Sequence, residues 1–176
     1  MHARLFMKQL IFAFLLQIVS VTVIAKKKAF LKQPPKKSTL FLAIDDIVSS
    51  IQINGNEYLK NEENKGWKTT YKYELGLLPG DYISITGKNG GNQKNNSRNP
   101  AGIIGSLHYQ APDGEMTIIN TNDKDWKCDD DTPVNLGLNS KNTWKFQWKD
   151  IEKKAMIIWG KKKEGTTTCT YTIPCS

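Results

Sequence analysis

The sequence predicts an all-β protein, a single-domain antiparallel β-sandwich, and three observations lead to this prediction. After residue 25, no long segment repeats its apolar residues at the period of a helix. The chain instead carries short segments in which apolar and polar residues alternate, as they do in strands with one buried face. Turn dipeptides such as Asn54-Gly55 and Asp113-Gly114 separate these segments at intervals of about eight to twelve residues, which is typical of sandwiches. The 176 residues suffice for one domain with a sizeable core but hardly for two.

The turns and strands can be placed along the chain. Asn54-Gly55 predicts a tight hairpin because both residues tolerate positive φ, and the chain then continues outward through Glu57–Leu59. Pro79-Gly80 predicts a type II turn, since Pro79 fixes φ and Gly80 accepts a positive φ. The expected strands are Thr39–Asp45, Ser50–Ile53, Trp67–Leu75, Asp81–Gly87, Ile103–Gln110, Glu115–Thr121, Trp144–Trp148, Ala155–Trp159 and Thr166–Ile173.

The N-terminus predicts a secretory signal peptide over residues 1–25. Arg4 and Lys8 precede the apolar run Leu10–Ile24, and Val23-Ile24-Ala25 offers tolerated residues at a cleavage site; Met7 could equally be the true start. A retained membrane anchor is the alternative, although the run is slightly short for a span of about 20 residues. We expect no transmembrane anchor after leader removal. The protein is then secreted or extracellular, or periplasmic or on the cell surface if bacterial. The composition of residues 26–38 predicts a flexible Lys/Pro-rich linker, and residues 39–176 are expected to form the sandwich domain.

The charge of the chain is basic but dispersed. Lysine and arginine number 25 against 17 acidic residues, for a net charge of +8. Nucleic-acid binding would need a continuous basic stripe, preferably with arginine, and the chain beyond the leader has only Arg98. We therefore expect no nucleic-acid partner. Attraction to an acidic glycan or an anionic surface and a merely solubilising surface both remain open.

The cysteines predict one disulfide. In an oxidising compartment two of Cys128, Cys169 and Cys175 should pair, and we expect Cys128 to bond to one of the other two, with Cys169–Cys175 as the rival. Without a Cys-x-x-Cys pair, and with His108 as the only histidine beyond the leader, zinc is not expected. Asp129–Asp131 and Asp45-Asp46 supply oxygen ligands suited to a structural calcium, but they lack the spacing of a calcium loop, so no cofactor is predicted.

The sequence predicts no catalysis. His108 lies in an alternating segment beside Tyr109, away from any turn, where a structural role is expected. Acidic pairs occur at Asp45-Asp46 and Glu62-Glu63, but nothing sets one carboxyl in an apolar pocket opposite another, as a glycosidase requires. We therefore predict that the protein is not an enzyme.

Five short motifs follow one another along the chain: Asp45-Asp46, Asn54-Gly55, Leu78–Ile85, Asn99–Leu107 and Thr121–Lys127. In this order they resemble the galactose-binding-like jelly-roll domains, which occur as carbohydrate-binding modules and as accessory domains of glycoside hydrolases. The resemblance covers roughly residues 40–127, implies a jelly-roll topology with Trp126 in the core, and supports the fold more than the ligand. The sequence departs from the pattern at Asp81-Tyr82, in an expanded loop before Pro100, and over residues 128–176.

The loop at 88–99 is the predicted ligand-binding edge. Its amides offer donors and acceptors together, and Arg98 adds a rigid fork of donors, while the resemblance places the Asp45-Asp46 corner among the loops nearby. An insertion without function is the alternative, and Asn95-Asn96-Ser97 is also a glycosylation sequon. We therefore expect a secreted, non-catalytic module that binds carbohydrate or an extracellular glycan surface. The alternative is a structural, matrix or adhesion protein that acts through protein–protein or surface association. The predicted ligand-binding residues are Asp45, Asp46, Asn89, Asn92, Gln93, Asn95 and Arg98.

Overall fold

Two antiparallel sheets make up the regular structure of this computed structural model. It describes residues 36–59, 63, 66–89, 101–111, 113–135, 148–161 and 165–175. The chain divides between Pro34 and Pro35 into two units, and all of the described residues lie in the second. None of these residues is helical, and every strand pair is antiparallel. Accordingly, nothing in the described part of the chain forms a helix long and apolar enough to cross a membrane.

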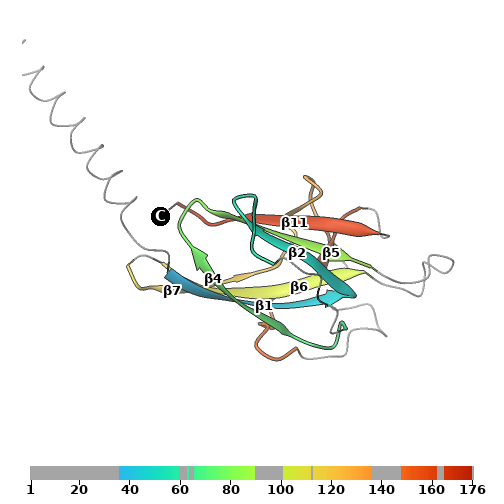
Figure 1. Ribbon diagram of the computed structural model, residues 1–176, viewed down its shortest axis with the longest axis horizontal. Helices are drawn as coiled ribbons and strands as arrows, with labels where there is room; N and C mark the ends of the chain where they lie inside the picture. Colours follow the sequence, from blue (N-terminus) through green and yellow to red (C-terminus); the bar gives the residue numbers. More distant parts are fainter. Residues whose placement is uncertain are drawn as a thin grey trace, which may run out of the picture. The chain divides into compact units, whose positions relative to one another are not determined.

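The strands are divided between the sheets so that neighbours along the chain often lie in opposite sheets (Figure 1). The first sheet has the order β4 (Tyr71–Leu77), β1 (Lys36–Asp45), β6 (Gly102–Gln110), β10 (Ile158–Trp159), β9 (Val134–Asn135), and β7 (Met116–Asn120) also pairs with β6. The second sheet has the order β3 (Asn56–Glu57), β2 (Ile47–Ile53), β5 (Tyr82–Lys88), β11 (Thr166–Thr172), β8 (Lys127–Cys128).

Alternate side chains of both sheets enter one shared core. Leu40, Leu42 and Ile44 of β1 are fully buried on one side, and Ile83 and Ile85 of β5 are fully buried on the other. The period of two along each strand explains this division, because successive side chains point to opposite faces of a sheet. A common core between two antiparallel sheets is consistent with a β-sandwich.

A second, smaller apolar cluster lies on the outer face of the first sheet. Ala43 of β1 and Ile104 of β6 pack there against Trp148, Ala155 and Ile157, with Trp67 at the margin. The indole N–H of Trp148 donates to the carbonyl of Trp67 at 2.8 Å. The segment 148–157 therefore covers part of this face, and β6 is buried on both sides over most of its length.

Several strand boundaries differ from the prediction. Lys36, Lys37 and Ser38 belong to β1 rather than to the linker, because they continue the ladder with β4 and Ser38 is fully buried. The strand predicted from Trp67 begins only at Tyr71, since Trp67 packs against the outer cluster. The strand predicted over Ala155–Trp159 is shorter and consists of β10 alone, because Ala155 and Ile157 pack in the outer cluster. Trp148 lies outside any strand, and residues 144–147 fall outside the described residues.

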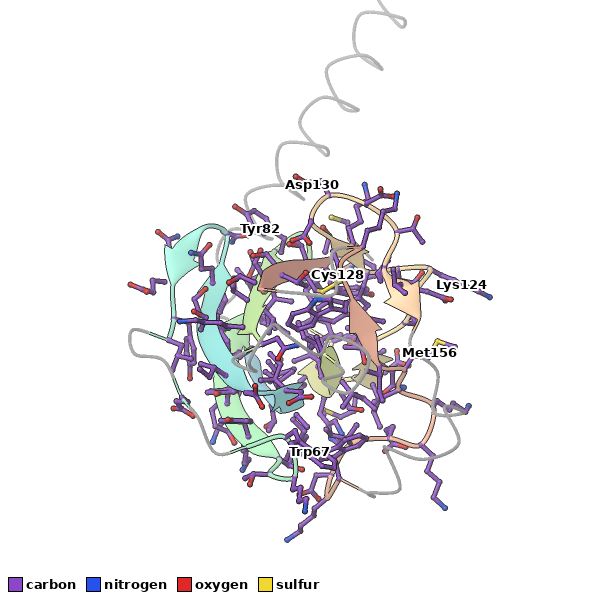
Figure 2. All side chains as sticks on the ribbon, turned by 90° about the vertical axis from the view of Figure 1, so that its right-hand side faces the viewer. Trp67, Tyr82, Lys124, Cys128, Asp130 and Met156 are labelled. Atoms are coloured by element: carbon purple, nitrogen blue, oxygen red, sulfur yellow. A yellow bond between two sulfur atoms is a disulfide. The ribbon has the colours of Figure 1, made fainter. Side chains whose placement is uncertain are left out.

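The predicted turns and the disulfide are confirmed. Asn54 and Gly55 have φ values of 52° and 77° in the hairpin between β2 and β3, and Gly80 has a φ of 86°. Cys128 of β8 faces Cys169 of β11 in the ladder, and the two form a disulfide. The rival pairing of Cys169 with Cys175 is wrong, and Cys175 is unpaired and exposed. Figure 2 shows the sulfur–sulfur bond at Cys128 inside the molecule, with the labelled Asp130 at its periphery.

Candidate functional site

The Asp45-Asp46 corner carries the chain from the first sheet to the second. Asp45 is the last residue of β1 and faces Gly102 at the start of β6. The amide of Asp46 donates to the carbonyl of Lys88, near the end of β5, at 3.2 Å. We call Asp45, Asp46, Lys88, Asn89 and Gly102 the loop corner. In Figure 1 it lies at the right-hand end of the strands, where β1 and β5 end and β6 begins.

The loop corner is held to the start of the last strand as well. The amide of Asn89 donates to the carbonyl of Gly165 at 2.9 Å, one residue before β11 begins. Lys88 faces both Ile47 and Thr166 in the second sheet. Strands from both sheets therefore fix the backbone on either side of residues 90–100.

Asp45 is a buried acid. Only 5% of the Asp45 residue is exposed to solvent. Burial, a hydrogen bond with Asp46 and the charge of Asp46 together raise the pKa of Asp45 from its ordinary value of 3.8 to about 8. Asp45 therefore keeps its proton at neutral pH. A protonated carboxyl can donate one hydrogen bond and still accept others, which an ionised carboxylate cannot do.

The structure brings together three of the predicted site residues. Asp45, Asp46 and Asn89 lie at the loop corner, and Asp46 and Asn89 are partly exposed. Sequence reasoning did not identify Gly102 or Gly165 as neighbours of these residues, because the contacts join segments distant along the chain and no local motif marks them. The other predicted residues, Asn92, Gln93, Asn95 and Arg98, lie outside the described residues.

Two carboxylates of the acidic turn Asp129–Asp131 make contacts that stabilise the fold. The carboxylate of Asp129 accepts hydrogen bonds from the Thr167 hydroxyl at 2.8 Å and from the Thr168 amide at 3.0 Å. The carboxylate of Asp131 pairs with Lys161. Among the residues that the structure places, no three histidine, cysteine, aspartate or glutamate side chains form a group that could hold a metal ion.

Gly160 is packed too tightly against this turn to carry a side chain. Its amide donates to the Thr167 hydroxyl at 3.2 Å, and an added Cβ would overlap the carboxylate of Asp129 and the hydroxyl of Thr167. We expect Gly160→Ala to lower the free energy of unfolding by about 1–3 kcal/mol, as overpacking of a filled interior does. Urea denaturation measures this, with Thr166→Ala at an exposed position as the control. Equal unfolding midpoints for the glycine variant and the wild type would contradict the expected steric conflict.

The remaining polar and aromatic candidates have packing roles. His108 lies six positions along β6 from Gly102, with its ring edge-on to Phe41 at a centroid distance of 5.0 Å. Trp126 is only 2% exposed, as predicted for a core residue, and its indole N–H donates to the carbonyl of Asn120 at 3.1 Å. Neither residue is among the contacts of the loop corner.

Comparison with known proteins finds no family model, no curated protein and no solved structure that matches this chain.

Proposed function

We propose that this protein is exported, has the galactose-binding-like jelly-roll topology, and binds carbohydrate at the loop corner without catalysing a reaction. The observation that carries the proposal is the grouping of Asp45, Asp46 and Asn89 at one end of the strands, from which the amide-rich segment 90–99 continues in sequence. Loops held by a rigid sheet are where binding residues commonly lie.

The chemistry of the corner suits a sugar. Each sugar hydroxyl both donates and accepts hydrogen bonds, so its binding site needs groups of both kinds. The partly exposed side chains of Asp46 and Asn89 carry both kinds of group: the Asn89 carboxamide has N–H donors and an oxygen acceptor, and the Asp46 carboxyl has acceptor oxygens.

The same geometry argues against glycoside hydrolysis. Catalytic carboxyls stand on either side of the sugar bond, about 5 Å apart in retaining enzymes and about 6.5–9.5 Å apart in inverting ones. Asp45 and Asp46 are consecutive residues, and Asp45 is only 5% exposed, which leaves its carboxyl little access to a sugar in solution. A binding role without catalysis therefore fits the pair better.

A glycan array probed with the full chain tests the proposal. We expect at least one sugar to bind in a way that the free sugar competes for. The double variant D46N/N89A should bind it at least tenfold more weakly, which corresponds to about 1.4 kcal/mol. D130N/N56A is the matched control, because both of its sites are exposed and neither belongs to the loop corner. Absence of any competable sugar, or equal loss in the two double variants, would reject the site. Arg98→Ala on the same array tests the part of the predicted edge that lies outside the described residues.

A second candidate function is adhesion through protein association. Met116 and Ile118 of β7 are 56% and 45% exposed, which is unusual for large apolar side chains on neighbouring outward positions of one strand. The exposed thiol of Cys175 would allow a covalent link to another chain. Binding that disappears with added salt and that no free sugar competes for would favour this candidate over the first.

A further inference from the structure

Tyr58 is an exposed aromatic residue that is fixed at both of its ends. It follows β3 directly and is 41% exposed. Its backbone amide donates to the carbonyl of Ile51 in β2 at 2.8 Å, and its hydroxyl donates to the carbonyl of Glu74 in β4 at 2.7 Å. Because β2 and β4 belong to different sheets, Tyr58 connects the two sheets and its ring is held in one place.

Two buried tyrosines support the ring of Tyr58. The ring of Tyr73 lies edge-on to it at a centroid distance of 6.5 Å, and the ring of Tyr71 stacks parallel to that of Tyr73 at 6.2 Å. The hydroxyl of Tyr73 donates to the carboxylate of Glu63 at 3.1 Å, and the hydroxyl of Tyr71 donates to the carbonyl of the same residue at 3.2 Å. Hydrogen bonds therefore hold all three rings in place, and a side chain that is already ordered loses little conformational entropy when a ligand binds.

Charged side chains lie beside Tyr58. Glu74, whose carbonyl accepts the hydrogen bond from Tyr58, pairs through its carboxylate with Lys37 at 3.2 Å and with Lys72 at 2.8 Å. The hydroxyl of Thr39 donates to the same carboxylate at 3.4 Å. The two lysine side chains are 77% and 59% exposed, and such exposed ion pairs contribute little to stability, so these donors and acceptors can turn to a ligand at small cost.

We propose that Tyr58 is an aromatic platform on which a pyranose ring of an unbranched oligosaccharide stacks, while Lys37, Lys72 and Glu74 form hydrogen bonds with its hydroxyls. The faces of an aromatic ring are electron-rich, so they attract the C–H groups on the face of a sugar ring. Sugars of the gluco configuration fit best, because their β-linked rings carry every substituent equatorially and present only C–H groups on both faces. The inference rests on the proposed carbohydrate binding but not on the loop corner.

The platform is separate from the loop corner. Glu74 faces Thr39 of β1, and Asp45 lies six positions further along the same strand. At about 3.3 Å for each residue of a strand, these two positions are about 20 Å apart. Substitutions at this distance act independently, so the two sites can be tested one at a time.

The test titrates the full chain with two gluco-configured tetrasaccharides, cellotetraose and N-acetylated chitotetraose, and follows the ring resonances of Tyr58 by NMR. We expect at least one of them to bind and to shift these resonances. Tyr58→Ala should weaken the binding about tenfold, whereas Tyr58→Phe keeps the ring and should retain most of the affinity. Tyr82→Ala is the matched control, because Tyr82 is 38% exposed and lies on β5, away from Glu74, and this variant should bind as the wild type does.

The charged side chains are tested with the same tetrasaccharides. The double variant K37A/K72A should weaken the binding about threefold, as the loss of hydrogen bonds to a ligand does. K153A/K154A is its matched control, because it removes two exposed lysines outside the platform and should leave the affinity unchanged. Equal losses in the two double variants would contradict the part assigned to Lys37 and Lys72.

Ring resonances of Tyr58 that neither tetrasaccharide shifts at millimolar concentration would overturn the platform, and this measurement on the wild type needs no variant to fold. An equal loss of affinity in Tyr58→Ala and Tyr82→Ala would overturn it as well. Affinity that falls in D46N/N89A but not in Tyr58→Ala would reject the platform and leave the loop corner as the site. Affinity that falls in Tyr58→Ala but not in D46N/N89A would reject the loop corner and leave the platform.

Discussion

Replacing Cys128 and Cys169 together by alanine should lower the free energy of unfolding by about 4 kcal/mol. The disulfide joins residues separated by 41 positions, and a crosslink over a loop of this length removes about that much chain entropy from the unfolded state. It also holds β8, a two-residue strand that among the described strands pairs with β11 alone. Urea denaturation of the oxidised wild type and of the double variant measures the difference.

Cys175→Ala is the control for this result. The side chain of Cys175 is exposed and unpaired, so its removal should change stability by no more than about 0.5 kcal/mol. A double variant as stable as this control would show that the disulfide contributes nothing to the folded state under these conditions.

Trp159→Ala should destabilise the protein by about 3–5 kcal/mol, the range found when a large aromatic side chain is removed from a packed core. Trp159 of β10 is only 1% exposed. Its ring crosses the space between the sheets, because a Cβ added to Gly87 of β5 would lie 2.9 Å from ring atom Cζ3. The loss should appear as a shift of the denaturation midpoint with an unchanged slope.

Trp67→Ala provides the comparison for Trp159. Trp67 is only partly buried and packs at the margin of the outer cluster, so its removal creates less cavity and should cost less than half as much. If both variants lost the same stability, the core between the sheets and the outer cluster would contribute equally, contrary to their burial.

The long strands could be predicted because each carries its own alternating pattern. In β4 and β5 the buried and exposed residues alternate with few exceptions, and this pattern is visible in the sequence itself. The strands β8 and β9 have two residues each and are defined by their partners in the ladder, so no local pattern marks them. Ala155 and Ile157 are apolar for another reason, namely that they cover the outer face of the first sheet, whereas Met156 packs against the core between the sheets.

The candidate site was predictable in part. The resemblance placed Asp45-Asp46 near the loop that begins after Lys88, and the amide of Asp46 does contact the carbonyl of Lys88. The burial of Asp45 could not be predicted, because it depends on how the ends of β1, β5 and β6 meet. An aspartate at the end of a strand is ordinarily expected in solvent, and its raised pKa is a property of the assembled fold.

The position of β11 in the second sheet constrains the order in which the protein can fold. β11 follows every other described strand in sequence, yet it lies between β5 and β8 and pairs with both. While the chain is being synthesised, β5 therefore has no partner on that side until residues 166–172 emerge. Pairings between such distant segments form slowly, because a long loop must close first. The unpaired edge of β5 would be open to pairing with other chains for that whole interval.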